Sequence, residues 1–196
     1  FAMMMAVILV FGCAWLALRL IEIPAHYARE NQTAVGLIGE ALSGDIGSEI
    51  RTLGQISHNS LVWSSLLNPA GREMQLASRF DARKNDPAAS PMLLLDHRGK
   101  RVLGELPAFI KTEQIATTAS AAIADKLPKI VVGNEAGQPF LLAVFPVIYP
   151  DTQDVVGALA HFVDVSSLFQ QRVAGVGRGI RVDLLHQSRV IASHCV

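Results

Sequence analysis

Two apolar strands joined by a short polar turn constrain the fold of this chain more than any other stretch. The strands are predicted over residues 140–149 and 155–164, and the turn-forming residues 150–154 separate them. Both alternating faces of each strand are apolar, which is typical of strands that are covered on both sides. We therefore expect this hairpin in the middle of a sheet, with a packed layer on each face.

Other strand and helix signals surround the hairpin. Further strands are predicted over 92–96, 101–105 and 129–134, with a tight turn around Gly99 between the first two. Asp164 can accept hydrogen bonds from the free amides of a helix that begins after it, and Thr112 can cap a helix over 112–126. A short helix is predicted over 72–80 and a surface loop over 81–91. This order predicts an α+β fold with five strands and one helical crossover after the second strand.

The first 23 residues are predicted to anchor the chain in a membrane. Residues 1–18 carry no charged side chain and would form about 27 Å of helix, with further apolar residues beyond Arg19. The alternatives are a buried core helix and a cleaved signal peptide. Since no small-x-small cleavage site followed by a polar start is evident after Leu18, an uncleaved anchor over 1–23 is the favoured interpretation.

A long amphipathic helix is predicted from residue 25 to about residue 67. Its apolar residues recur at steps of three and four. Each glycine within it costs up to about 1 kcal/mol relative to alanine, so the helix needs packing to persist. The stripe is ordinary core in the simplest interpretation, and it is long enough to pack on a second copy as well. It consists of Val35, Ile38, Leu42, Ile46, Ile50, Leu53 and Ile56.

Charge and motif content exclude several classes of function. Lys plus Arg and Asp plus Glu both number 17, so no net field attracts nucleic acid. The sequence contains no GxSxG elbow, no phosphate loop and no HExxH motif, so no catalytic residue is assigned. The spacing of His186, His194 and Cys195 matches no recognised metal site, and no metal or cofactor is predicted.

The end of the chain echoes the first predicted hairpin. Leu94 and Leu95 before one turn correspond to Leu184 and Leu185 before another, and the second turn is one residue shorter. Hairpins often look alike, so the echo is either coincidental or the opening of a repeated module. We expect a linker and the truncated start of a second, membrane-proximal module over 174–196, within a fragment of a longer protein.

The order and spacing of these elements resemble the Cache sensor domain. The resemblance is carried by the anchor, the long helix, the turn over 96–102, Pro146, and the run from Val155 through Asp164 to Leu168. Cache domains are PAS-like extracytoplasmic modules of bacterial chemoreceptors, sensor histidine kinases and cyclic-dinucleotide enzymes. The resemblance implies a PAS-like five-stranded antiparallel sheet, with the sensor module over 24–173. It also implies a ligand pocket between the sheet and the crossover.

The same resemblance implies a location and partners. The sensor module would be periplasmic or extracellular, anchored in the bacterial inner membrane, and the chain would form a homodimer. The sequence departs from the amino-acid-binding subgroup, because 110–126 contains no Arg, Trp or Tyr and the acidic contact of that subgroup falls on Phe162. The trailing hairpin fits a double Cache arrangement.

Three polar residues are predicted to contact a ligand. Lys129, at the entry to the third strand, can pair with an anionic group as a point charge, or it is a solvated strand end. Tyr149 and His161 offer polar groups on otherwise apolar strands. His161 also suits a hydrogen-bonded histidine of the core or surface.

Three further candidates come from their place in the predicted fold. Phe145 and Phe162 are either ligand platforms or core residues. Thr117 lies on the helical crossover, where it either faces a ligand or belongs to the exposed side.

These features predict a ligand-sensing domain of a membrane receptor, with any catalytic output in another part of the protein. A ligand that prefers one arrangement of the sheet and the long helix would shift their populations. The alternative is a membrane-anchored structural or protein-interaction domain with an empty or collapsed pocket.

Overall fold

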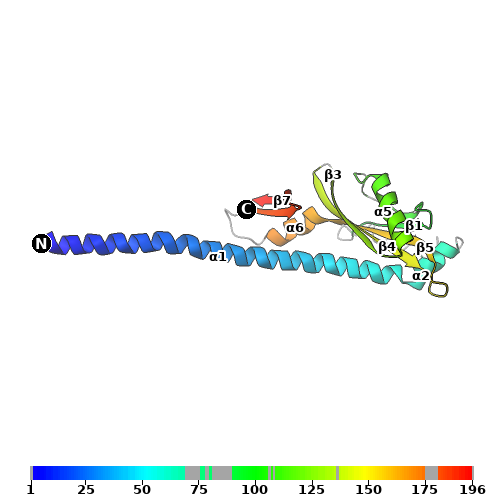
Figure 1. The fold of residues 1–196 in the computed structure, drawn as a ribbon, viewed down its shortest axis with the longest axis horizontal. Coiled ribbons are helices and arrows are strands. Elements are labelled where there is room, and N and C mark those ends of the chain that lie inside the picture. The colour runs from blue at the N-terminus through cyan, green and yellow to red at the C-terminus, as the bar shows by residue number, and fades with distance from the viewer. Residues whose placement is uncertain are drawn as a thin grey trace. The chain divides into compact units, whose positions relative to one another are not determined.

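A computed structural model describes residues 2–68, 76–77, 80, 90–105, 107, 109–135, 137–174 and 181–195, with side chains from residue 30 onward. The chain divides into two compact units, residues 1–41 and residues 42–196. Figure 1 labels the elements, which follow in the order α1 (Ala2–Ser57), α2 (Ser60–Leu67), β1 (Met92–Asp96), β2 (Arg101–Gly104), α5 (Thr112–Asp125), β3 (Lys129–Glu135), β4 (Gln138–Ile148), β5 (Val155–Asp164), α6 (Val165–Val173), β6 (Arg181–His186) and β7 (Arg189–Cys195).

The first unit is the N-terminal part of α1. The predicted anchor over 1–23 falls here; its backbone is helical from Ala2, and its side chains lie outside the described residues. Among the residues whose side chains the structure describes, from residue 30 onward, no helix is both long enough and apolar enough to cross a membrane, and the predicted anchor lies outside that range. Val35 and Leu37 are exposed within this unit.

The second unit is built on a five-stranded antiparallel sheet with the strand order β2-β1-β5-β4-β3. β5 pairs with β1 on one side and with β4 on the other, so the β4–β5 hairpin lies inside the sheet, as its apolar faces predict. Leu142 stands opposite Phe162 in this register, and Phe145 stands opposite Leu159. The predicted α+β fold with five antiparallel strands is confirmed.

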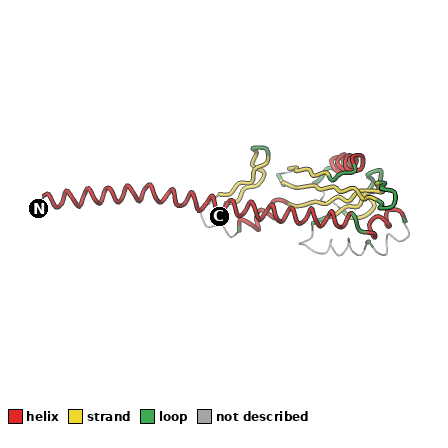
Figure 2. Tube along the Cα trace, turned by 60° about the horizontal axis from the view of Figure 1, so that its bottom comes forward, coloured by secondary structure: helices red, strands yellow, loops and turns green. Residues whose placement is uncertain are grey.

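Each face of the sheet carries its own hydrophobic core, and each buried Leu, Val or Phe side chain contributes about 1.5–3 kcal/mol. Figure 2 shows the strands between α5 and the C-terminal part of α1. Alternate residues of one strand go to opposite faces, as their pleat dictates. The α5 face buries Leu93, Leu95, Phe140, Leu142, Phe162 and Ile115, and the α1 face buries Leu94, Leu141, Phe145, Leu159, Val163 and Leu53.

Residues 25–67 form parts of two helices, whereas the sequence predicted one. α1 ends at Ser57, whose hydroxyl donates to the carbonyl oxygen of Gly54 at 2.8 Å. Asn59 then caps α2, because its side chain accepts a hydrogen bond from the backbone N–H of Leu61 at 2.9 Å. These short polar side chains satisfy backbone groups that a continuous helix would otherwise use, and so they favour a break.

The two predicted helix starts differ in outcome. Asp164 caps α6 as expected, since its carboxylate accepts from the backbone N–H of Ser167 at 3.1 Å. The N-cap of α5 is Lys111 and not the predicted Thr112, and no side-chain hydrogen bond closes this helix start. The predicted helix over 72–80 and loop over 81–91 fall mostly outside the described residues, and residues 175–180 of the predicted linker fall entirely outside them.

The β6–β7 hairpin repeats a structural detail of the β1–β2 hairpin. The register of β1 against β2 shifts between Leu94 and Leu95. The register of β6 against β7 shifts between Leu184 and Leu185, which are the residues that echo them in the sequence. The two hairpins thus share an irregularity at matched positions, and the second module remains a prediction.

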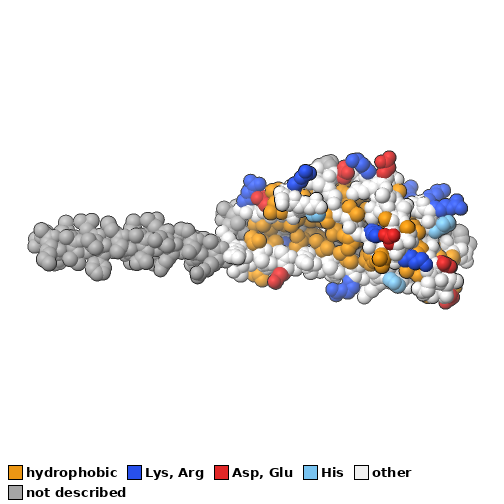
Figure 3. Space-filling view, viewed as in Figure 1, with side chains coloured by type: hydrophobic (Ala, Val, Ile, Leu, Met, Phe, Trp, Pro, Cys, Tyr) orange, Lys and Arg blue, Asp and Glu red, His pale blue; other side chains and the backbone are white. Residues whose placement is uncertain are grey.

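The surface of the second unit mixes charges of both signs. On the face drawn in Figure 3, Lys and Arg side chains alternate with Asp and Glu around a band of hydrophobic ones. Such a mixture provides no single-sign field to attract a polyanion. The exposed large hydrophobic residues of this unit include Leu67, Leu127, Ile130, Leu185 and Val190.

Candidate functional site

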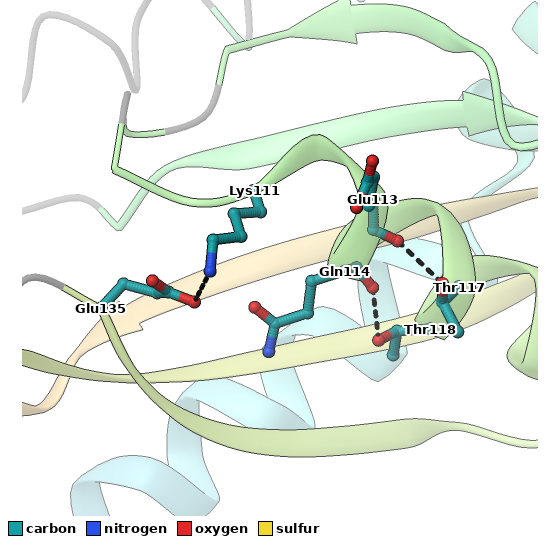
Figure 4. Close-up of a pocket in the computed structure, with 6 residues that line it drawn as sticks. All are labelled: Lys111, Glu113, Gln114, Thr117, Thr118 and Glu135. Carbon is teal, nitrogen blue, oxygen red and sulfur yellow. Dashed lines mark hydrogen bonds and ion pairs between the residues drawn. The ribbon is translucent and has the colours of Figure 1, made fainter.

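A hollow of about 390 Å³, lined by polar residues, lies beside the first half of α5. The first turns of α5 and the end of β3 form it, so the helical crossover and the edge of the sheet meet there (Figure 4). The Cache resemblance implied a pocket between the sheet and this crossover. The lining residues are Lys111, Glu113, Gln114, Thr117, Thr118 and Glu135.

An ion pair crosses this hollow. Nζ of Lys111, at the start of α5, lies 3.2 Å from Oε1 of Glu135, at the end of β3. The two side chains are 68% and 28% exposed, and exposed pairs of this kind contribute about 0–1 kcal/mol. The pair can therefore open at little cost and offer its ammonium and carboxylate groups to a ligand.

The other polar groups of the hollow differ in what they can still do. The hydroxyl of Thr117 donates to the carbonyl oxygen of Glu113, and that of Thr118 donates to the carbonyl oxygen of Gln114, both at 2.8 Å. Each hydroxyl proton is thus used within the helix, and the oxygen retains its capacity to accept. The side-chain amide of Gln114 points toward the Lys111–Glu135 pair in Figure 4 and can both donate and accept.

Aromatic rings fill the space between α5 and the sheet. The ring centroids of Phe140 and Phe162 lie 5.4 Å apart. Phe109 meets Phe162 edge to face, also at 5.4 Å. These geometries are those of stabilising aromatic pairs. Beneath the helix the apolar core is therefore packed, and the hollow lies at its polar margin.

The predicted site residues on the sheet lie on two different faces. Phe162 belongs to the aromatic cluster under α5, whereas Phe145 is buried on the opposite face, against α1. His161 is also on the α1 face, 1% exposed, with Nε2 at 3.0 Å from Oε2 of Glu49. Of the six predicted residues, Thr117 alone lines the hollow described above.

Lys129 and Tyr149 have partners outside the hollow. Lys129 forms an ion pair with Asp125, four residues earlier at the end of α5. The hydroxyl of Tyr149 donates to Oδ2 of Asp151 at 2.6 Å, and its ring meets Trp63 edge to face with centroids 5.0 Å apart. The hydrogen bond to Asp151, aided by the charge of that carboxylate, raises the pKa of Tyr149 above its ordinary value of 10.0.

Sequence reasoning missed Lys111 and Glu135 as a pair. Each stands at an element boundary, which is the signal that was available. Their meeting depends on how α5 lies over β3, which no local pattern encodes. Over the described part of the chain, no group of three His, Cys, Asp or Glu residues is placed to hold a metal ion.

Comparison with known proteins finds likeness in structure alone. No family model and no curated protein matches the chain. The sensor domain of the Vibrio cholerae histidine kinase DctB matches with a TM-score of 0.54 and 15% identity, over 84% of this chain and 66% of that one. This chain thus spans slightly under two thirds of the DctB domain.

Two further solved structures match over a similar share of this chain. The periplasmic domain of Vibrio cholerae LuxQ matches with a TM-score of 0.53 and 11% identity, over 84% of this chain and 78% of that one. The ligand-binding domain of the Campylobacter jejuni chemoreceptor Tlp3, in complex with L-valine, matches with a TM-score of 0.54 and 14% identity, over 85% and 72%. The fold is that of these sensor domains, as the Cache resemblance implied.

Proposed function

We propose that this chain is the ligand-sensing domain of a bacterial membrane receptor and that it binds a small polar molecule in the hollow beside α5. The observation that carries the proposal is the pair of opposite charges, Lys111 and Glu135, held across a hollow at the crossover of a sensor-type sheet. The fold shared with the DctB, LuxQ and Tlp3 domains supports it, as does the L-valine bound in the Tlp3 structure.

The chemistry of the hollow defines what it can bind. Its volume of about 390 Å³ falls within the roughly 300–1,000 Å³ of small-molecule sites. Lys111 offers a cation, Glu135 a carboxylate and Gln114 an amide. A ligand with complementary groups would exchange the exposed ion pair for its own contacts and change how the start of α5 is held to β3. A ligand that binds one arrangement of α5 and β3 more tightly would raise the fraction of molecules in that arrangement.

The proposal includes a setting for the domain. The N-terminal residues 1–23 would anchor it in the inner membrane, the sensor module would be periplasmic, and two copies would form a homodimer. This chain itself would have no catalytic role, and the output would belong to another domain of the same receptor.

A thermal-shift screen of the 196-residue chain tests the proposal. A ligand that binds the folded state alone raises Tm by mass action. We expect a concentration-dependent rise with a small charged metabolite from a library of carboxylates, amines and amino acids. Lys111→Ala and Glu135→Ala should remove the rise, whereas Lys100→Ala, an exposed lysine in the β1–β2 turn, should retain it. The absence of a rise with every compound would count against sensing.

The same screen decides between two lysines. Lys111 and Lys129 both form an ion pair with a carboxylate, Glu135 and Asp125 respectively. Loss of binding in Lys111→Ala but not in Lys129→Ala would assign the ligand to the hollow. The reverse result would assign it to the entry of β3, where the sequence predicted an anion contact.

A second candidate function is a protein-interaction domain without a small ligand. The packing of Phe109, Phe140 and Phe162 favours it, because these rings occupy the space between α5 and the sheet. This candidate predicts no thermal shift with any metabolite. It also predicts that the Tm of Lys111→Ala, like that of the native chain, does not change with any metabolite in the screen.

A further inference from the structure

Two carboxylates of α1, one helical turn apart, hold two different elements of the second unit. Asp45 pairs with Arg172 of α6 through two hydrogen bonds, Nε to Oδ2 at 2.7 Å and Nη2 to Oδ1 at 2.6 Å. Glu49 lies 3.0 Å from Nε2 of His161 in β5. We call these four residues the acidic clasp. All of them belong to the unit formed by residues 42–196.

The spacing of the clasp lets both pairs form at once. Residues i and i+4 lie on the same face of a helix, so Asp45 and Glu49 both lie on the face of α1 that contacts β5 and α6. Their partners are on consecutive elements, because β5 ends at Asp164 and α6 begins at Val165. A displacement of the β5–α6 segment along α1 would disturb both pairs together.

The two halves of the clasp differ in character. The Asp45–Arg172 half is solvent-accessible but bidentate, and the hydrogen bond from Arg172 holds the pKa of Asp45 below its ordinary value of 3.8. The Glu49–His161 half reaches inward, since His161 is 1% exposed. Losing the contact of a buried polar group is more costly than losing an exposed pair. The Asp45–Arg172 pair therefore fixes the orientation of α6 relative to α1. The Glu49–His161 contact fixes how closely β5 approaches α1.

A steric feature marks the same position of α1. Gly54 stands over the ring of Phe145, with an added Cβ at 3.3 Å from Cε1. Sliding α1 by one turn in either direction would place Ile50 or His58 over that ring. Neither direction preserves both contacts, because Ala41 or Leu53 would replace one of the two carboxylates.

We propose that the acidic clasp couples the β5–α6 segment to α1, so that the long helix moves together with the sheet and α6 when these are displaced. As a route for regulation this rests on the proposed function, whereas the coupling itself is a property of the fold. Helix shifts in signalling proteins measure about 1–2 Å, and a loose contact would absorb a movement of that size.

Distance measurements on the ligand-free, 196-residue chain test the coupling independently of any ligand. Spin labels on cysteines at Ser48 and Gln171, both exposed, report the position of α1 against α6 in a background with Cys13→Ser and Cys195→Ser. We expect one narrow distance distribution. In the double variant Asp45→Asn with Glu49→Gln it should widen or shift by about 1–2 Å.

Control variants keep the test decisive. Glu40→Gln makes the same chemical change on α1 outside the clasp and should leave the distribution unchanged. Exchange of charge, Asp45→Arg with Arg172→Asp, should restore a narrow distribution that Asp45→Arg alone broadens. An unchanged distribution in the double amide variant, or no difference between the charge exchange and its single variant, would overturn the coupling and leave ligand binding untouched.

Discussion

The backbone of Gly54 in α1 lies directly against the ring of Phe145 in β4. A Cβ at position 54 would stand 3.3 Å from Cε1 of the ring, inside the roughly 3.5–4.0 Å of an optimal carbon–carbon contact. Phe145 is 9% exposed and part of the core on this face, so its ring has little room to move. Gly54 therefore sets how closely the helix approaches the sheet.

Substitution of this glycine should behave differently from substitution of an exposed one. Gly44→Ala meets nothing within 4 Å and should stabilise the fold by about 0.5–1 kcal/mol, since alanine is the better helix former. Gly54→Leu should destabilise it by about 1–3 kcal/mol through overpacking against Phe145. Urea unfolding of the full chain measures both free energies. Equal effects at the two positions would contradict the close approach.

The sheet could be predicted because its signal is local. Residues 140–148 and 155–164 are apolar on both alternating faces, and that pattern is sufficient to place a hairpin inside a sheet. The start of α6 could likewise be predicted, because the carboxylate of Asp164 can cap a helix. The break after Ser57 escaped prediction because side-chain hydrogen bonds, and not hydrophobic periodicity, end the helix there.

The candidate site was less predictable because it depends on register and crossing geometry. A period of two separates His161 from Phe162, but it does not tell which face receives α5. The pairing of His161 with Ala143 puts that histidine on the α1 face, where Glu49 meets it. Lys111 and Glu135 meet because α5 crosses the end of β3, a relationship between distant residues.

The aromatic cluster under α5 depends on a glycine in β3. A Cβ at Gly133 would overlap the ring of Phe140, which is fully buried. Gly133→Ala should therefore destabilise the fold by about 1–3 kcal/mol. This loss outweighs the usual gain from replacing glycine with alanine, which lowers the conformational entropy of the unfolded chain. Asn134→Ala, on the exposed side of the same strand, is the matched control and should change stability by less than about 0.5 kcal/mol. Chemical denaturation compares the two variants.

The Asp45–Arg172 pair should contribute to stability in a pH-dependent way. The hydrogen bond from Arg172 lowers the pKa of Asp45 below 3.8, so the folded state favours the ionised carboxylate. A lowered pKa gives stability that is present above the unfolded value and lost as the pH falls through the folded value. The stability difference between the native chain and Arg172→Gln should hold near neutral pH and shrink below pH 3.8. A difference independent of pH would contradict the ionic pair.

Tyr149 offers a spectroscopic test of the turn beyond β4. Its pKa is raised above 10.0, mainly by the hydrogen bond to Asp151, so the folded state favours the neutral phenol. The resulting stability is present below the unfolded pKa of about 10 and is lost as the pH rises through the folded value. Asp151→Ala should bring the titration of Tyr149 back toward 10.0, as measured by ultraviolet absorbance of the phenolate.

The background for this titration is Tyr27→Phe, because the chain contains two tyrosines and Tyr149 must be the one observed. An unchanged titration in Asp151→Ala would contradict the hydrogen bond. The same signal also tests the ligand assignment, since Tyr149 lies outside the hollow that Lys111 and Glu135 span. A compound that raises Tm by binding in that hollow should leave the pKa of Tyr149 where it is. A change in the pKa of Tyr149 on binding would instead indicate that the ligand has displaced Asp151 from the Tyr149 hydroxyl. Tyr149 would then be a ligand contact, as the sequence predicted.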